Sequence, residues 1–173
     1  MEKATFGAGC FWGVEAGFRR VPGVIATLVG YCGGHTENPT YKEVCTDSTG
    51  HAEVVEVTFD PARVAYEQLL EVFWKNHDPT TPDRQFCDRG HQYRTAIFVH
   101  DATQRRLAEA SKQRLAAAGT LPGPIVTEIV AAAAFYPAEE YHQDYYRKNP
   151  LRYKLYRRGC GRDERLAELW KAR

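Results

Sequence analysis

The chain has 173 residues, of which 43% are hydrophobic and 26% are charged, and its formal net charge is +1. A chain of this length can bury a hydrophobic core without disulfide support, so we predict a single domain over residues 1–173 with a tail at 150–173. The near-neutral charge gives no reason to expect a nucleic-acid partner. No apolar run approaches the length of a membrane span, and the first residues, MEKATFGAGCFWG, lack the long apolar core of a signal peptide.

The predicted elements begin with a strand over 3–8 and a helix over 12–20, which stops at a Pro-Gly pair. A β-branched run predicts a strand over 24–31, and alternating polarity predicts another over 52–60. Apolar residues at helical spacing predict a helix over 66–78, and a further strand follows at 92–100. This β-α-β-β-α-β order is the ferredoxin-like arrangement. We therefore expect an α+β protein, a two-layer α/β sandwich with a mainly antiparallel mixed sheet.

Further elements follow this core. Asp101 is a suitable N-cap for a helix over 102–118, which Gly119 would end. We then expect a strand over 127–135, and a short helix over 139–149 that stops at Pro150. The tail up to Tyr156 is basic and is predicted to be irregular, and 162–173 is predicted to form a last short helix.

The five cysteines are odd in number and widely spaced, and no two of them form a C-x-x-C pair: Cys10, Cys32, Cys45, Cys87 and Cys160. This pattern argues against a secreted disulfide framework and against a zinc ribbon, and it fits a cytoplasmic protein with mostly free thiols. No Cys/His group has the paired spacing of a structural zinc site, so we expect no bound metal. Nucleotide-binding and G-x-S-x-G motifs are absent from the sequence.

The stretch GAGCFWG contains the first candidate reactive residue, Cys10, at the start of a predicted helix. The positive end of the helix dipole favours a thiolate there. Gly7 and Gly9 would allow another molecule to approach the backbone closely. The local features fit equally well a cysteine that is simply buried in a glycine turn.

Glu53 is the second candidate, because its strand phase places it on the apolar face with Val55, Val57 and Phe59. A carboxyl held against an apolar face has a raised pKa, which suits a proton donor near neutral pH. The alternative is that Glu53 lies at the end of the strand and bends towards water.

Other candidates lie in the loops and in the tail. Asp88 is expected in a tight turn beside Gly90, and Tyr93 on the next strand, where its hydroxyl needs a partner in the core or on a substrate. Tyr41 is a loop tyrosine with the same two alternatives. Cys160 lies between two glycines in a tail that is expected to be flexible, so its thiol can reach a distant sulfur. A nucleophilic cysteine and a second cysteine at opposite ends of a chain suit the conversion of a sulfenic acid into a disulfide.

Taken together, these residues give the chain a resemblance to the peptide methionine sulfoxide reductase A family, which reduces the S epimer. The resemblance covers nearly the whole chain and rests on these segments: GCFWG at 9–13, GYCGG at 30–34, NPTYKEVC at 38–45, TGHAEVVEV at 49–57, DRGHQYRTAIF at 88–98 and AEEYHQDYYRKNP at 138–150. The family is also similar in fold, an α/β sandwich with a ferredoxin-like core.

The resemblance implies a role for each matching residue. Cys10 would attack the sulfoxide sulfur, Glu53 would protonate the oxygen, and Cys160 would resolve the sulfenic acid by forming a Cys10–Cys160 disulfide. Thioredoxin, or dithiothreitol in vitro, would reduce this disulfide, and no bound cofactor is implied. Tyr41 and Tyr93 would hydrogen-bond the oxygen, Asp88 would position substrate and water, and the substrate would be bound by Phe11, Trp12, Gly9 and His51. The substrates would be oxidised proteins or free methionine sulfoxide, and we expect a monomer.

Two points stay open at this stage. Cys87, directly before Asp88, is the cysteine that could compete with Cys160 as the resolving thiol, whereas Cys32 and Cys45 are interpreted as structural. The alternative function is a non-enzymatic thiol redox sensor. That function accounts for the cysteines but not for Glu53 and the two tyrosines; a thiol peroxidase leaves the aromatic pair beside Cys10 without a role.

Overall fold

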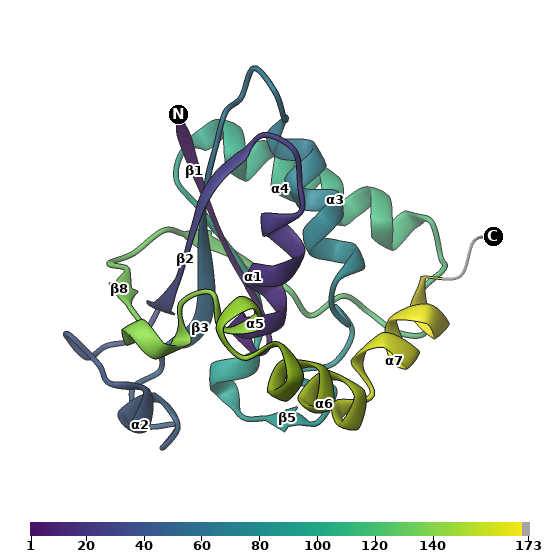
Figure 1. The fold of residues 1–173 in the computed structure, drawn as a ribbon. Coiled ribbons are helices and arrows are strands. Elements are labelled where there is room, and N and C mark those ends of the chain that lie inside the picture. Colours follow the sequence, from purple (N-terminus) through teal and green to yellow (C-terminus); the bar gives the residue numbers. More distant parts are fainter. Residues whose placement is uncertain (171–173) are drawn as a thin grey trace.

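A computed structural model of the chain describes residues 1–170 (Figure 1). The strands are β1 (Glu2–Ala8), β2 (Val24–Cys32), β3 (Ala52–Phe59), β4 (Arg84–Gln85), β5 (Asp88–Arg89), β6 (Thr95–Val99), β7 (Glu128–Ala131) and β8 (Tyr136–Pro137). The helices are α1 (Phe11–Arg19), α2 (Tyr41–Val44), α3 (Tyr66–Lys75), α4 (Ala102–Ala117), α5 (Tyr145–Lys148), α6 (Pro150–Cys160) and α7 (Arg162–Leu169). Single 3-10 turns lie at His91–Tyr93 and Glu140–His142.

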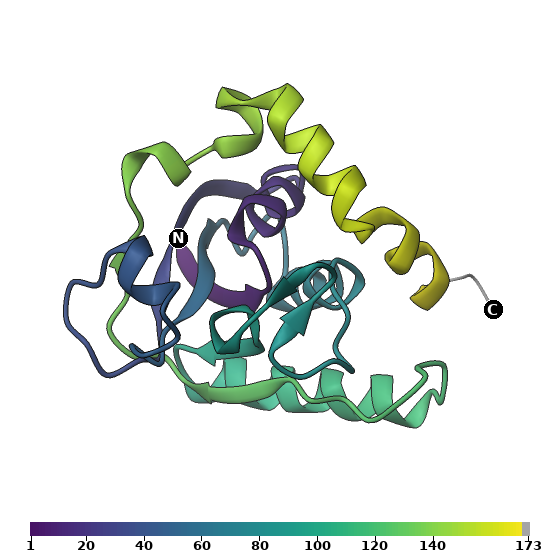
Figure 2. The same cartoon turned by 90° about the horizontal axis from the view of Figure 1, so that it is seen from below.

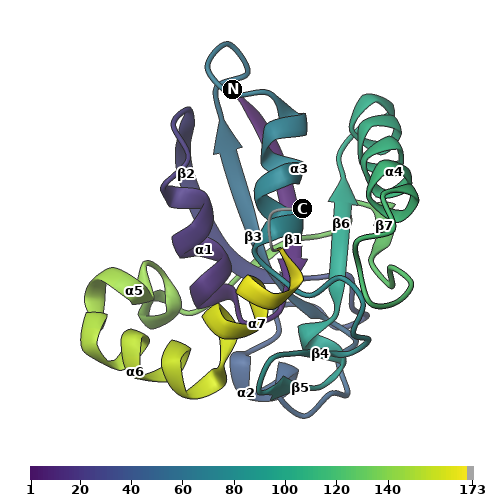
Figure 3. The ribbon, with the colours of Figure 1, turned by 90° about the vertical axis from the view of Figure 1, so that its right-hand side faces the viewer.

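The main sheet has the strand order β7-β6-β1-β3-β2-β8. Every pairing in it is antiparallel except that of β6 with β7 at one edge. The four inner strands, with α1 and α3 as their connections, have the order of a ferredoxin-like fold, so the predicted core is confirmed. Figure 3 shows α1 and α3 side by side on one face of the sheet, with α4 beyond them beside β6.

The core forms between this sheet and its helix layer. The Phe6 ring on β1 stacks on Phe18 of α1 at 4.9 Å and on Phe73 of α3 at 5.1 Å. Side chains of β3 alternate between the two faces: Val55, Val57 and Phe59 join this core, whereas Ala52 and Val54 join a smaller cluster behind the sheet. The same alternation directs Glu53 towards the helix layer.

Several predicted boundaries were wrong in ways that matter for the site. Residues 91–93 form a 3-10 turn and β6 begins only at Thr95, so Tyr93 is not on the strand with Ile97 and Val99. The helix expected over 139–149 is broken at Asp144, whose φ is 52°. The strand expected over 127–135 is only four residues long, Glu128–Ala131.

The tail also differs from the prediction. Residues 150–156 were expected to be irregular, but they belong to α6. The helix starts at Pro150, because proline is suited to the first turn of a helix and can also end the helix before it. Gly161, with φ 72°, ends α6 and leads directly into α7. The predicted last helix was drawn to residue 173, and 171–173 lie outside the described residues. Figure 2 shows α6 and α7 running along one side of the molecule past the start of α1.

The tail is anchored to the loop that follows α3. The side chain of Arg162 is 5% exposed, and its Nη2 donates to the backbone carbonyl of Asn76. Arg165 forms an ion pair of 3.4 Å with the buried carboxylate of Asp78. These contacts fix the position of Cys160, which the sequence suggested would be flexible.

Within residues 1–170, no helix is long and apolar enough to cross a lipid bilayer.

Candidate active site

Cys10 lies directly between β1 and α1, as the residue that precedes the helix. Gly9 before it has φ +90°, and a Cβ there would lie 2.5 Å from Cβ of Gln85. The glycine is therefore required for the turn and for close packing against Gln85. The sequence suggested that this space was open to an approaching molecule, but the side chain of Gln85 occupies it.

The thiol of Cys10 is buried, with only 7% of the residue exposed. Burial raises its pKa well above the ordinary value, and the negative charges of Glu53 and Asp88 raise it further. Hydrogen bonds from the Trp12 backbone N–H and with the Tyr156 hydroxyl act in the opposite direction but are smaller. The expectation that the helix N-terminus makes Cys10 a thiolate was therefore wrong for this state of the site, where the sulfur keeps its proton.

Glu53 is 1% exposed, so it does not bend towards water. Its two carboxyl oxygens accept hydrogen bonds from the Phe11 backbone N–H at 3.3 Å and from Nε2 of Gln92 at 3.0 Å. Burial raises the pKa of Glu53 from 4.5 to about 8, although these two hydrogen bonds oppose the shift. At neutral pH the group is a carboxylic acid with a proton to donate, held near Cys10.

Two tyrosines interact with the same carboxyl from different segments. Tyr41 begins α2 and Tyr93 ends the 3-10 turn before β6. The pKa of each hydroxyl is raised, first by burial and then by the negative charge of Glu53. Both therefore stay protonated near neutral pH and can donate hydrogen bonds to an oxygen beside Glu53. Although Tyr93 is not in the strand, the turn still brings its hydroxyl to this carboxyl.

The aromatic residues after Cys10 lie beneath the C-terminal segment. Phe11 is 1% exposed and packs against the rings of Tyr41 and His142. Trp12 donates from Nε1 to Nδ1 of His142 at 2.9 Å, and its face stacks on Tyr145 with the ring centroids 3.9 Å apart. An apolar group can reach the Trp12 face that stacks on Tyr145 only after the segment that carries Tyr145 moves.

Asp88 lies on β5 of the small β4–β5 hairpin, not in the tight turn that the sequence predicted. Arg89 lies between it and Gly90. Its Oδ2 accepts a hydrogen bond from the hydroxyl of Tyr156 on α6. The Tyr156 hydroxyl also hydrogen-bonds the Cys10 sulfur, and its ring meets Trp12 edge-on at 5.5 Å. The structure thus brings Asp88, Tyr156 and Cys10 together.

Several residues of this cluster were not predicted from the sequence: Gln92, His142, Tyr145 and Tyr156. Gln92 and His142 are buried polar side chains within segments already noted for the resemblance, DRGHQYRTAIF and AEEYHQDYYRKNP. The available signal was a polar side chain among aromatic residues, because such a side chain requires a partner when it is buried. Tyr156 had no such signal, since its segment was expected to be irregular.

A disulfide lies beside the cluster. Cys87 and Cys160 are joined, with their Cα atoms 4.9 Å apart, whereas Cys10, Cys32 and Cys45 are free. The structure therefore differs from the expected Cys10–Cys160 disulfide. The sulfurs lie within 4.8 Å of a carboxylate oxygen of Asp88, but sulfurs bonded to one another offer no thiolates to a metal.

His51, expected to bind substrate, is used differently. Its Nδ1 accepts from the Gly34 backbone N–H at 3.0 Å, and its Nε2 donates to the Thr36 carbonyl at 2.8 Å. Both ring nitrogens therefore hold the loop after β2, and neither is free for a ligand.

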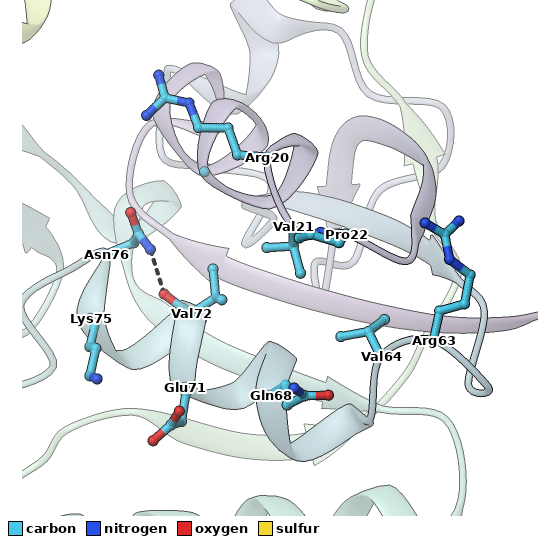
Figure 4. Close-up of a pocket in the computed structure, with 11 residues that line it drawn as sticks. Arg20, Val21, Pro22, Arg63, Val64, Gln68, Glu71, Val72, Lys75 and Asn76 are labelled. Carbon is cyan, nitrogen blue, oxygen red and sulfur yellow. Dashed lines mark hydrogen bonds between the residues drawn. The ribbon is translucent and has the colours of Figure 1, made fainter.

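A surface groove of about 650 Å³ lies at the far end of α1 (Figure 4). Its lining includes Val21, Val64 and Val72, with the charged groups of Arg63 and Lys75 around them. None of the candidate residues lines this groove. The chemistry is therefore at the N-terminal end of α1, not in the groove.

Comparisons with known proteins agree with this geometry. A family model described as peptide methionine sulfoxide reductase matches residues 2–173. The chain is 54% identical to a Bacillus licheniformis protein named peptide methionine sulfoxide reductase MsrA, over 98% of this chain and 93% of that protein. It is 63% identical to a protein of the same name from Methanothermobacter thermautotrophicus, over 87% of this chain and 89% of that protein.

Solved structures agree as well. Methionine sulfoxide reductase A of Corynebacterium diphtheriae is 43% identical with a TM-score of 0.78, over 87% of this chain and 76% of that one. Reduced Mxr1 from Saccharomyces cerevisiae is 34% identical with a TM-score of 0.81, over 87% of this chain and 86% of that one. These proteins share the family of the matching model, and the site described above gathers a buried thiol, a neutral carboxylic acid and tyrosine hydroxyls in one cluster. The chain belongs to the peptide methionine sulfoxide reductase family and is an oxidoreductase of the MsrA type.

Proposed function

We propose that this enzyme reduces the S epimer of methionine sulfoxide, both free and in oxidised proteins, through a sulfenic acid at Cys10. The observation that carries the proposal is the protonated Glu53 carboxyl, buried beside the Cys10 thiol with two tyrosine hydroxyls near it. A sulfoxide oxygen leaves only when it is protonated, and this site holds a proton donor of suitable pKa.

The residues act in a defined order in this proposal. Tyr41 and Tyr93 hydrogen-bond the sulfoxide oxygen, and Glu53 donates its proton to it. Cys10 attacks the sulfur, methionine leaves and Cys10 becomes a sulfenic acid. A positioned general acid contributes about 10²–10⁴-fold to such a step, and one preorganised donor about 10²–10³-fold. Ionisation of Cys10 is easier while Glu53 is neutral, because the charge of an ionised Glu53 raises the pKa of the thiol.

The aromatic pair binds the part of the substrate that does not react. Phe11 and Trp12 offer an apolar surface to the methyl group, provided that Tyr145 and Tyr156 move off the Trp12 ring. The Cys87–Cys160 disulfide holds the end of α6, and the Tyr156 ring on this helix meets Trp12 edge-on. We therefore assign the observed conformation to an oxidised enzyme, with the substrate site closed by the tail, and expect the reduced enzyme to open it.

Recycling needs two electrons from outside. Cys160 attacks the Cys10 sulfenic acid and releases water, and a thioredoxin reduces the resulting disulfide. Mxr1, the yeast protein whose reduced form is similar to this chain, has also been solved in complex with Trx2, which supports this partner. We further propose a monomer in the cytoplasm, a reducing compartment in which Cys10, Cys32 and Cys45 persist as thiols. No metal or nucleotide takes part in these steps.

The test uses the reduced protein with each sulfoxide epimer separately, dithiothreitol as reductant, and methionine as the measured product. Turnover of the S epimer alone is the expected result. Turnover of the R epimer, or of peroxide in preference to sulfoxide, would contradict the proposal. A second assay replaces dithiothreitol with thioredoxin, its reductase and NADPH, and follows NADPH oxidation.

A further inference from the structure

We propose that Cys87 is a second recycling cysteine, which takes Cys160 away from Cys10 by thiol–disulfide exchange and leaves the Cys87–Cys160 disulfide for the reductant. The inference rests on the proposed function, because it needs an oxidised Cys10 to begin. It assigns to Cys87 a role that sulfoxide reduction by Cys10 and Cys160 does not require.

The pairing itself is the first observation. The structure contains Cys87–Cys160 and a free Cys10 thiol. If only Cys10 and Cys160 took part, the oxidised protein would contain a disulfide that includes Cys10. The observed pairing has the same oxidation level but returns Cys10 to the thiol form.

The neighbours of the three cysteines suit the exchange. Cys160 lies one helical turn after Tyr156 on α6, so both residues share the helix face that meets Cys10. Cys87 directly precedes Asp88, whose charge acts on Cys10 and which binds Tyr156. The Cys87 backbone N–H also donates to Sγ of Cys160 at 3.2 Å. Both Cys87 and Cys160 are thus neighbours of residues that touch the site of the sulfenic acid.

The steps balance in atoms and electrons. Cys10 thiol and the sulfoxide give methionine and the Cys10 sulfenic acid. Cys160 thiol attacks this sulfur, forming the Cys10–Cys160 disulfide and water. Cys87 thiolate then attacks Sγ of Cys160, the Cys10–Cys160 bond breaks, and Cys10 leaves with the proton that Cys87 gave up. A dithiol reductant finally converts Cys87–Cys160 into two thiols and is itself oxidised to a disulfide.

Access to the outside gives this exchange a purpose. Cys10 is 7% exposed, so a protein-sized reductant has little access to its sulfur. Cys87 is exposed, and Cys160 lines an open pocket of about 350 Å³ together with Arg84 and Arg165. Nearby guanidinium groups favour a thiolate and so ease its departure from the disulfide. The exchange therefore moves the disulfide from a buried position to a surface position that a reductant can reach.

The experiment counts methionine formed by fully reduced protein with excess S-sulfoxide and no reductant. In wild type, exchange frees Cys10 to react again, so we expect about two methionines per chain. In Cys87→Ser the first disulfide keeps Cys10 bound, so we expect about one. Cys32→Ala, at a buried free cysteine behind the sheet, is the matched control and should match the wild type. The disulfide should map to Cys87–Cys160 in the wild type and to Cys10–Cys160 in Cys87→Ser.

The outcomes separate the two hypotheses. One methionine per wild-type chain with a Cys10–Cys160 disulfide, or equal yields from wild type and Cys87→Ser, would overturn the role of Cys87 while leaving the proposed function intact. No methionine from the wild type would refute the proposed function, and the exchange with it. The single methionine expected from Cys87→Ser also shows that this variant is folded, so a low yield cannot be attributed to misfolding.

Discussion

Replacing Glu53 with glutamine removes a titrating proton from the centre of the site and keeps the size of the side chain. The glutamine oxygen can still accept from the Phe11 N–H, and its amide can donate to a reoriented Gln92. The variant therefore tests protonation rather than packing.

The magnitude follows from the pKa. Glu53 titrates at about 8 in the folded protein and ordinarily at 4.5, so between these values the folded chain holds a proton that the unfolded chain has lost. The free energy of unfolding then falls as the pH rises through this window, by about 1.4 kcal/mol per unit. From pH 4.5 to pH 7 the wild type loses about 3 kcal/mol through this group. Glu53→Gln has no such titrating group. The difference in the free energy of unfolding between the variant and the wild type should therefore shift in favour of the variant by about 3 kcal/mol from pH 4.5 to pH 7.

Urea denaturation at a series of pH values measures the effect, with the Cys87–Cys160 disulfide intact in both proteins. Glu67→Gln, at an exposed carboxylate on α3, controls for the loss of a charge. Parallel curves for the wild type and Glu53→Gln between pH 5 and 8 would refute the reasoning.

The same variant tests the chemistry. Methionine formation in a single turnover should fall about 10²–10⁴-fold in Glu53→Gln, since the general acid is missing. In the wild type this rate should fall as the pH rises through about 8, where Glu53 loses its proton. If the variant keeps that decline, another group supplies the proton.

Three further predictions concern other parts of the site. Cys10→Ser should abolish methionine formation even in a single turnover; residual product would assign the attack to another thiol. Tyr156→Phe loses a part-buried hydrogen bond to the Asp88 carboxylate and should lower the free energy of unfolding of the oxidised protein by about 1.5–3 kcal/mol in urea, and an unchanged midpoint would contradict this contact. Gly9→Ala should lower thermal stability, because φ is +90° and the new Cβ would overlap Gln85, whereas Gly123→Ala, with no neighbour within 4 Å, should not.

Much of the fold could be predicted because its signals are local. Alternation over 52–60 specified β3 and the face of Glu53, and helical spacing over 66–78 specified α3. The tail could not be predicted, because Pro150 ends one helix and starts another with equal ease. Tyr93 was placed on a strand because the pattern does not distinguish a 3-10 turn from the first residues of a strand.

The sequence by itself determined the β-α-β-β-α-β order of the core, and it placed a cysteine at the start of α1 and a glutamate on the inner face of β3, because periodicity is written along the chain. Only the tertiary structure decided the protonation of Cys10, since burial of the thiol outweighs the effect of the local helix end on its pKa. It also decided which cysteine pairs with Cys160. Residues 87 and 160 are separated by 73 positions, and only the docking of α6 against the β4–β5 hairpin brings their sulfurs together.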